Sequence, residues 1–108
     1  MQLPSEIKFA DEKVKKSFED LEREDPVLFK IITQAFYNIK ENAFCGIQVP
    51  KKQIPKEYKL EYDAENLWKY DLPKGWRLLY TIRRDEIVVF SIILEWLDHK
   101  EYERRFKY

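Results

Sequence analysis

Residues 66–84, NLWKYDLPKGWRLLYTIRR, decide the fold of this chain. Two runs rich in aromatic and aliphatic side chains, Leu67–Leu72 and Trp76–Ile82, flank the tripeptide Pro73-Lys74-Gly75. Strand-forming residues on both sides of a short segment with proline and glycine are typical of a β-hairpin. The sequence therefore predicts two antiparallel strands in which Leu72 pairs with Trp76.

The two faces of this hairpin differ in character, because side chains alternate between the faces of a strand. The predicted core face consists of Trp68, Tyr70, Leu72, Trp76, Leu78 and Tyr80, and the other face of Leu67, Lys69, Asp71, Arg77, Leu79 and Thr81. We expect the second face to display Arg77 in mid-strand among polar neighbours. Arginine keeps its proton and a strand holds it firmly, so Arg77 suits a fixed phosphate ligand. The alternative is a surface arginine paired with Asp71, which contributes little to stability.

The N-terminal part of the chain predicts a short strand and two helices. Glu6–Ala10 is read as the strand, and apolar residues at helical spacing predict a first helix near residues 12–23, capped by Asp11. Asp25-Pro26 places a capping residue before a proline at the first helical position, so a second helix is expected from Pro26 to Asn42. The two helices are expected to form an antiparallel hairpin.

The segment from Gly46 to Tyr58 contains Pro50 and Pro55 and is expected to be irregular or extended. Its lysines either contact phosphate or belong to a solvated linker, and exposed lysines are far more often the second. They are Lys51, Lys52 and Lys56.

After the hairpin, Glu86–Trp96 contains IVVFSIILEW and is apolar at nearly every position, which predicts a strand at the centre of its sheet. A two-residue turn at Arg84-Asp85 would put Phe90, Ile92 and Trp96 on the face of Arg77. A three-residue turn or a bulge would move them to the aromatic core face and leave Ser91 and Glu95 beside Arg77. The second arrangement buries more apolar surface and is the one we expect. Asp98 is expected to cap a short terminal helix in which Tyr102 and Phe106 share one side.

The expected fold class is therefore α+β, in one domain over residues 1–108. The element order is β-α-α-β-β-β with a short C-terminal helix, and the helical hairpin packs on one face of a mainly antiparallel, strongly twisted sheet.

Composition narrows the function classes. Basic and acidic side chains number 20 each, so bulk charge points neither to nucleic acid nor to an acidic partner. A single cysteine, Cys45, rules out an internal disulfide and suits a reducing compartment, and one histidine with one cysteine makes a poor metal ligand set. No segment resembles a signal peptide or a membrane span, so we expect a cytoplasmic protein without cofactor or metal.

The chain resembles the RelE/ParE superfamily of small toxins from bacterial and archaeal type II toxin–antitoxin pairs. The residues that carry the resemblance are the N-terminal helical hairpin, the segments Asn66–Leu72 and Gly75–Ile82, and the ending Asp98-His99-Lys100-Glu101-Tyr102. The resemblance implies a RelE-like mRNA interferase that cuts messenger RNA on the ribosome and is neutralised by a cognate antitoxin. The ParE branch of the family acts instead on DNA gyrase.

The resemblance also implies roles for single residues. Metal-free cleavage by the neighbouring 2′-hydroxyl needs a proton acceptor, a cation for the phosphorane and a donor to the 5′ oxygen. Arg77 matches the family's phosphate-stabilising arginine, and His99 lies where related toxins place a basic residue. Tyr102 would orient the base or stack on a nucleotide. The alternatives are a histidine that only decorates a helix start and a tyrosine that only packs with Phe106, while Glu95 is a second candidate base.

The predicted RNA contacts are basic residues in the linker, at the strand turns and in the tail. They are Lys51, Lys52, Lys56, Lys74, Arg84, Lys100, Arg104 and Arg105. A zero net charge departs from the strongly basic character of ribosome-dependent toxins. A non-catalytic protein of the same fold, either directed at gyrase or only bound to its antitoxin, and a stand-alone RNA-binding module therefore remain as alternatives.

Overall fold

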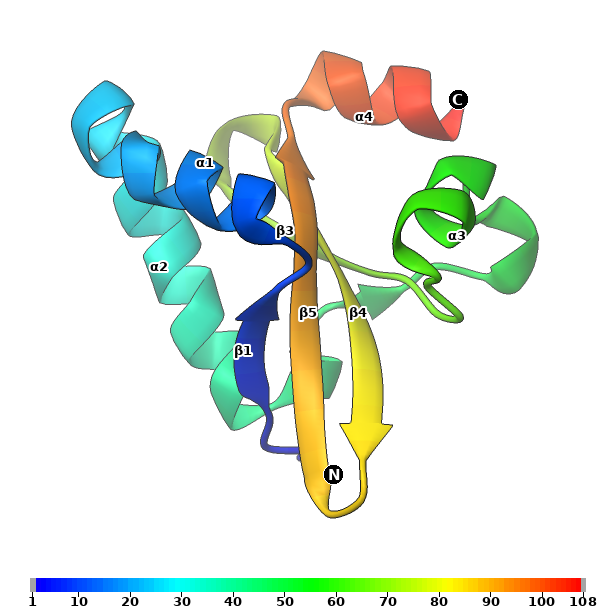
Figure 1. Ribbon diagram of the computed structural model, residues 1–108. Coiled ribbons are helices and arrows are strands. Elements are labelled where there is room, and N and C mark those ends of the chain that lie inside the picture. The colour runs from blue at the N-terminus through cyan, green and yellow to red at the C-terminus, as the bar shows by residue number, and fades with distance from the viewer. Residues whose placement is uncertain (1, 108) are drawn as a thin grey trace.

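The computed structural model describes residues 2–107, which form an α+β fold with a five-stranded mixed sheet (Figure 1). Within this range the helices and strands follow one another as β1 (Glu6–Phe9), α1 (Glu12–Glu24), α2 (Pro26–Glu41), β2 (Ile47–Gln48), α3 (Lys56–Tyr62), β3 (Trp68–Asp71), β4 (Arg77–Asp85), β5 (Val88–Leu97) and α4 (His99–Phe106). Single 3₁₀ turns lie at Ala43–Cys45, Lys51–Gln53 and Pro73–Gly75. No helix in the described range is long and apolar enough to cross a membrane.

The N-terminal strand and both helices are confirmed. Asp11 accepts a hydrogen bond from the backbone N–H of Val14, and Asp25 accepts one from that of Leu28, so each helix begins at the predicted cap. The backbone N–H of Asp25 also donates to Leu21, which ends α1 one residue before Pro26 opens α2. The predicted ends differ from the observed ones by a single residue.

The central hairpin is confirmed together with its register. The backbone N–H of Leu72 donates to the carbonyl of Trp76 at 2.9 Å, and Asp71 lies opposite Arg77. The tight connection requires left-handed backbone at Lys74 (φ 63°) and Gly75 (φ 82°). The predicted core face does pack against α1 and α2. Its members in that cluster are Trp68, Tyr70, Leu72, Trp76, Leu78 and Tyr80.

The sheet order is β1-β5-β4-β3-β2, with β1 parallel to β5 and the other pairs antiparallel. The apolar strand β5 is therefore central, as predicted. The β4–β5 turn is made by Glu86 and Ile87, because β4 continues to Asp85, which pairs with Val88.

A bulge in β5 explains why the predicted faces of this strand are only partly right. Tyr80 pairs with Ile93 and Leu79 with Glu95, so an extra residue lies within the ladder rather than at the turn. Beyond the bulge, Glu95 shares the face of Arg77 and Trp96 joins the aromatic core, as expected. Before the bulge, the side chains of β5 point to the faces opposite to those predicted.

Phe90 and Ile92 therefore pair with Arg83 and Thr81 on the face of Arg77, where we had placed Ser91. Ser91 lies instead on the side of α2 and is fully buried. Its hydroxyl is 2.8 Å from that of Ser5.

The face opposite α1 and α2 is not open, although the sequence predicted helices packed on one face only. Leu67 and Leu79 on this face are fully buried in a second cluster with Tyr58 of α3 and Tyr102 of α4. Figure 1 shows α3 and α4 on the side of the sheet away from α1 and α2. The prolines were read as breakers of the whole 46–58 segment, but Pro55 directly precedes α3, a position that proline tolerates well.

Candidate functional site

Arg77 is the first residue of β4, at the end of the sheet from which α4 departs, rather than in mid-strand. Its Nη1 donates to the carbonyl of Gly75 at 2.8 Å and to that of Trp76 at 3.3 Å. Its Nε lies 3.0 Å from Asp71 Oδ1. Only 19% of the side chain is exposed, so the guanidinium is held in one place on the face away from α1 and α2.

Tyr102 brings α4 onto this arginine. The capping box made by Asp98 and Glu101 starts the helix immediately after β5, which turns the Tyr102 ring back towards the sheet. The ring lies 5.2 Å from the Arg77 guanidinium carbon and stacks on Phe106 with centroids 4.4 Å apart. The contact with Arg77 and the packing with Phe106 therefore both exist. With 3% of Tyr102 exposed, a nucleotide could stack on this ring only if α4 moved.

His99 is the first residue of α4 and reaches the same end of the sheet. A Cβ built on Gly75 would lie 3.1 Å from that of His99, so the helix start sits against the β3–β4 turn. The imidazole is 59% exposed, and its Nε2 lies 3.2 Å from the carboxylate of Glu103 one helical turn later. This contact ties Nε2 of the ring to the Glu103 carboxylate.

Lys69 is a member of this group that the sequence did not single out as a site residue. Its Nζ lies 3.2 Å from Asp71 Oδ1 and 5.6 Å from the centroid of the Tyr102 ring. Lys69, Asp71 and Arg77 occupy one face of adjacent strands, and that alternation is the signal that could have identified the lysine. We call Lys69, Asp71, Arg77, His99 and Tyr102 the α4-end cluster.

The predicted RNA contacts do not gather on one surface. Lys74 lies in the β3–β4 turn and Lys100 directly follows His99 in α4, so these two border the α4-end cluster, whereas Arg104 lines a hollow with Glu57 and Lys107. Lys52 and Lys56 line a groove shared with Lys107, beside the last turn of α4, and Lys51 borders a separate hollow next to α3.

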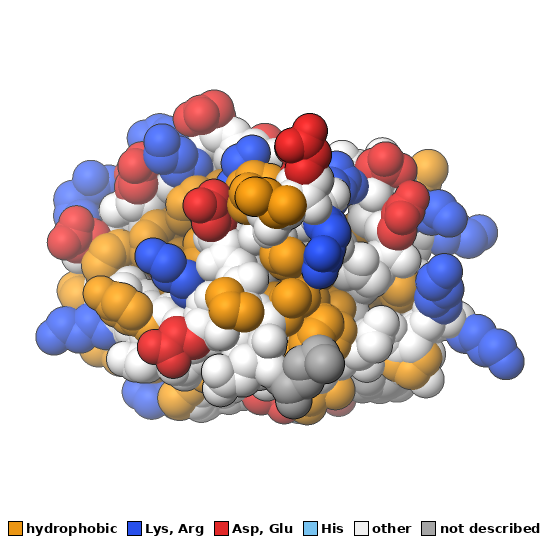
Figure 2. All heavy atoms as spheres, turned by 90° about the horizontal axis from the view of Figure 1, so that it is seen from below, with side chains coloured by type: hydrophobic (Ala, Val, Ile, Leu, Met, Phe, Trp, Pro, Cys, Tyr) orange, Lys and Arg blue, Asp and Glu red, His pale blue; other side chains and the backbone are white. Residues whose placement is uncertain are grey.

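Arg84 lies at the opposite end of the sheet, near the β4–β5 turn, and is not brought together with Arg77. Figure 2 shows that end of the molecule, where basic, acidic and hydrophobic side chains are interspersed. No field of one sign marks that face as a phosphate-binding surface.

Arg105 is engaged in contacts within the protein. Its Nη1 donates to Glu95 at 2.9 Å, its Nε is 4.0 Å from Glu57, and its guanidinium lies over the Tyr58 ring. Burial alone would lower the pKa of Arg105, but the neighbouring carboxylates, above all Glu95, raise it. We therefore assign Arg105 to holding α4 on the sheet.

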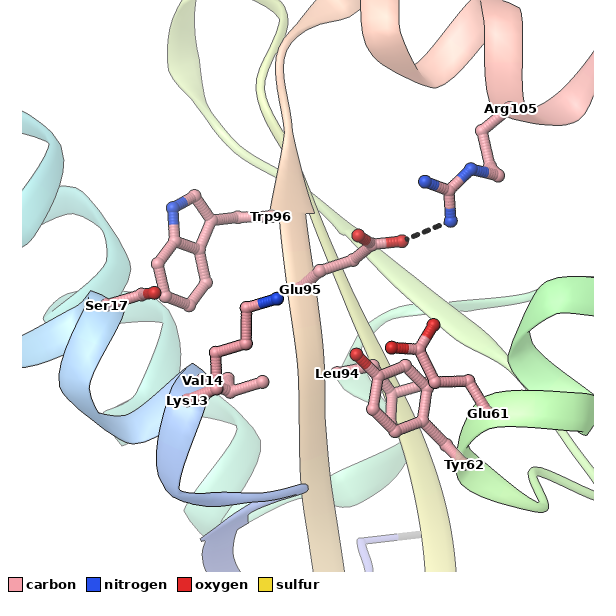
Figure 3. Close-up of a pocket in the computed structure, with 9 residues that line it drawn as sticks. All are labelled: Lys13, Val14, Ser17, Glu61, Tyr62, Leu94, Glu95, Trp96 and Arg105. Carbon is pink, nitrogen blue, oxygen red and sulfur yellow. Dashed lines mark hydrogen bonds and ion pairs between the residues drawn. The ribbon is translucent and has the colours of Figure 1, made fainter.

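Glu95 is correspondingly committed to this ion pair, as Figure 3 shows. The carboxylate borders a cleft of ≈ 390 Å³ between α1 and α3, into which Lys13 extends from α1. Burial and the nearby Glu95 carboxylate raise the pKa of Tyr58, so this buried phenol stays protonated. Glu95 shares a face with Arg77, but its contacts are with Arg105.

No group of three or more histidine, cysteine, aspartate or glutamate side chains within residues 2–107 is arranged to hold a metal ion. The chemistry available at the α4-end cluster is that of two cations, one imidazole, one phenol and one carboxylate. Comparison of the chain with protein-family models, with curated proteins and with solved structures found no match. Function is therefore inferred from the residues and their geometry.

Proposed function

We propose that this chain is a RelE-like toxin of a type II toxin–antitoxin pair, and that it cuts messenger RNA on the ribosome. It acts in the cytoplasm, without a metal or cofactor, and is neutralised by a cognate antitoxin protein. The observation that carries the proposal is the contact between Arg77 and Tyr102, which joins the central hairpin to the C-terminal helix at the point where His99 begins that helix.

The roles follow from the geometry of the α4-end cluster. Cleavage of RNA by its own 2′-hydroxyl removes a proton from that hydroxyl, forms a bond from O2′ to phosphorus and breaks the bond to the 5′ oxygen. Arg77 is rigidly held and always charged, so it stabilises the negative charge that grows on the phosphoryl oxygens. His99 is exposed, and an imidazole can both accept and donate a proton, so it is the group that transfers protons.

Induction of the chain in bacterial cells tests this proposal. We expect protein synthesis to stop and new RNA 5′ ends to appear within translated sequences. Arg77→Ala should relieve the toxicity while the protein keeps its thermal unfolding midpoint. Arg83→Ala is the matched control, since Arg83 is an exposed arginine on the same strand and face. Undiminished toxicity of Arg77→Ala would reject the assignment.

A second candidate function is that of a non-catalytic interaction protein of the same fold, directed at gyrase or bound only to an antitoxin. It is favoured by the internal pairing of Arg77 with Asp71 and of His99 with Glu103, together with zero net charge. This candidate predicts arrest of growth without transcript cleavage. An assay of gyrase supercoiling with the purified chain then shows whether such a protein acts on gyrase or only binds an antitoxin.

A further inference from the structure

Asp71 holds two cations of the α4-end cluster with one oxygen atom. Its Oδ1 lies 3.2 Å from Lys69 Nζ and 3.0 Å from Arg77 Nε. Lys69 and Arg77 are 20% and 19% exposed, whereas Asp71 is 48% exposed. The carboxylate therefore sits between two fixed cations and the solvent.

The two cations are positioned independently of this carboxylate. The Tyr102 ring lies within 5.2 Å of the Arg77 guanidinium carbon and 5.6 Å of Lys69 Nζ, and backbone carbonyls accept from Arg77 Nη1. Two cations that converge on one point form an anion site, whichever anion occupies it. In this chain the occupant is an internal side chain.

The fit between Asp71 and Arg77 is incomplete. The Nε of Arg77 is buried and has no aligned hydrogen-bond acceptor among the described residues, although Asp71 Oδ1 is only 3.0 Å away. The contact is thus an ion pair without the hydrogen bond that would normally accompany it. A tetrahedral phosphodiester, which offers oxygens in several directions, can satisfy this N–H better than the tethered carboxylate can.

We propose that Asp71 is an internal competitor for the phosphate site formed by Lys69 and Arg77. A phosphodiester must displace the carboxylate before it reaches the two cations, so the chain binds free RNA weakly. RNA that other contacts hold nearby can still displace the carboxylate, because its local concentration is high. The identity of the ligand as RNA rests on the proposed function, but the displacement of Asp71 does not require cleavage.

The test measures binding of a fluorescent, fully 2′-O-methylated RNA oligonucleotide, which the 2′-hydroxyl mechanism cannot cut, to the full chain by fluorescence anisotropy. Asp71→Asn removes the charge and keeps the shape, and Asp71→Ala removes the carboxylate entirely. We expect both variants to bind about tenfold more tightly than the unaltered chain, since one negative charge next to two cations is lost.

Asp85→Asn is the matched control. It changes the net charge equally but lies at the far end of β4, so its binding should change less than about twofold. In a Lys69→Gln background, the gain from Asp71→Asn should shrink, because one of the two cations is missing. Thermal unfolding of each variant verifies that it is folded.

Unchanged or weaker binding by both Asp71 variants overturns the proposal, because a carboxylate that only orients Arg77 would give that result. Equal gains from Asp71→Asn and Asp85→Asn overturn it too, as does the absence of binding by every variant. Tighter binding without RNA cleavage by any variant would uphold the internal competitor and refute the nuclease. Cleavage by the unaltered chain, without tighter RNA binding by Asp71→Asn, would uphold the nuclease and refute the internal competitor.

Discussion

Tyr80→Phe should destabilise the protein by about 2 kcal/mol, because one buried hydroxyl ties the chain after α2 to the sheet. The hydroxyl donates to the carbonyl of Ala43 at 2.6 Å and accepts from the backbone N–H of Gly46 at 3.2 Å. Tyr80 and Ala43 are both fully buried, so water does not replace the lost hydroxyl at the carbonyl. A buried polar group left without a partner costs about 1–3 kcal/mol, and the amide adds to this.

The assay is urea unfolding followed by circular dichroism, with the free energy of unfolding extrapolated to water. A loss of about 2 kcal/mol corresponds to a fall of roughly 10 °C in Tm for a domain of this size. Tyr37→Phe is the control, since Tyr37 is 65% exposed and should change stability by less than about 0.5 kcal/mol. Equal effects of the two substitutions would refute the role assigned to the Tyr80 hydroxyl.

Three further perturbations have outcomes that the structure fixes. Gly46→Ala should destabilise the protein more than Tyr80→Phe, because the new Cβ would lie 2.7 Å from a backbone carbonyl oxygen of β3. Urea unfolding measures this change, and a loss below about 1 kcal/mol would contradict the close approach. Gly75→Ala would bring a Cβ to 3.1 Å from that of His99 at a φ of +82°, which alanine rarely adopts, so the melting temperature and the rate of RNA cleavage should both fall. Full activity at an unchanged melting temperature would contradict the placement of α4. Burial raises the pKa values of Tyr58 and Tyr80, so on raising the pH the unfolded chain loses these two protons before the folded chain does. The free energy of unfolding should therefore keep its full value below about pH 10 and fall above it by up to about 1.4 kcal/mol per pH unit for each tyrosine. Stability that is constant from pH 9 to 11, measured by urea unfolding, would contradict this.

Most of the fold could be predicted because its signals are local. Asp11 and Asp25 mark the helix starts, and the spacing of aromatic residues around Pro73-Lys74-Gly75 fixes the hairpin register. The bulge in β5 could not be located, because Ile92, Ile93 and Leu94 are all apolar and each fits either face. The helix α3 was missed because Pro50 and Pro55, which both precede it, were read as breakers of the whole segment.

The candidate site could be predicted only in part. Arg77 was singled out from the strand pattern and Tyr102 from the resemblance, and the structure brings them into contact. The sequence could not show that Arg105 is engaged by Glu95, since that pair depends on where α4 packs. The pairing of Lys69 with Asp71 is a detail of side-chain geometry that neighbouring charges on one strand do not determine.

The nuclease role that we propose for the α4-end cluster is most directly tested by the chemistry of the RNA ends formed when the chain is added to programmed ribosomes in a single turnover. Attack by the 2′-hydroxyl leaves a 2′,3′-cyclic phosphate upstream and a 5′-hydroxyl downstream. We predict these ends for the unaltered chain and a rate at least about 100-fold lower for Arg77→Ala. Ends that carry a 5′-phosphate, or equal rates for the two proteins, would contradict the role given to Arg77.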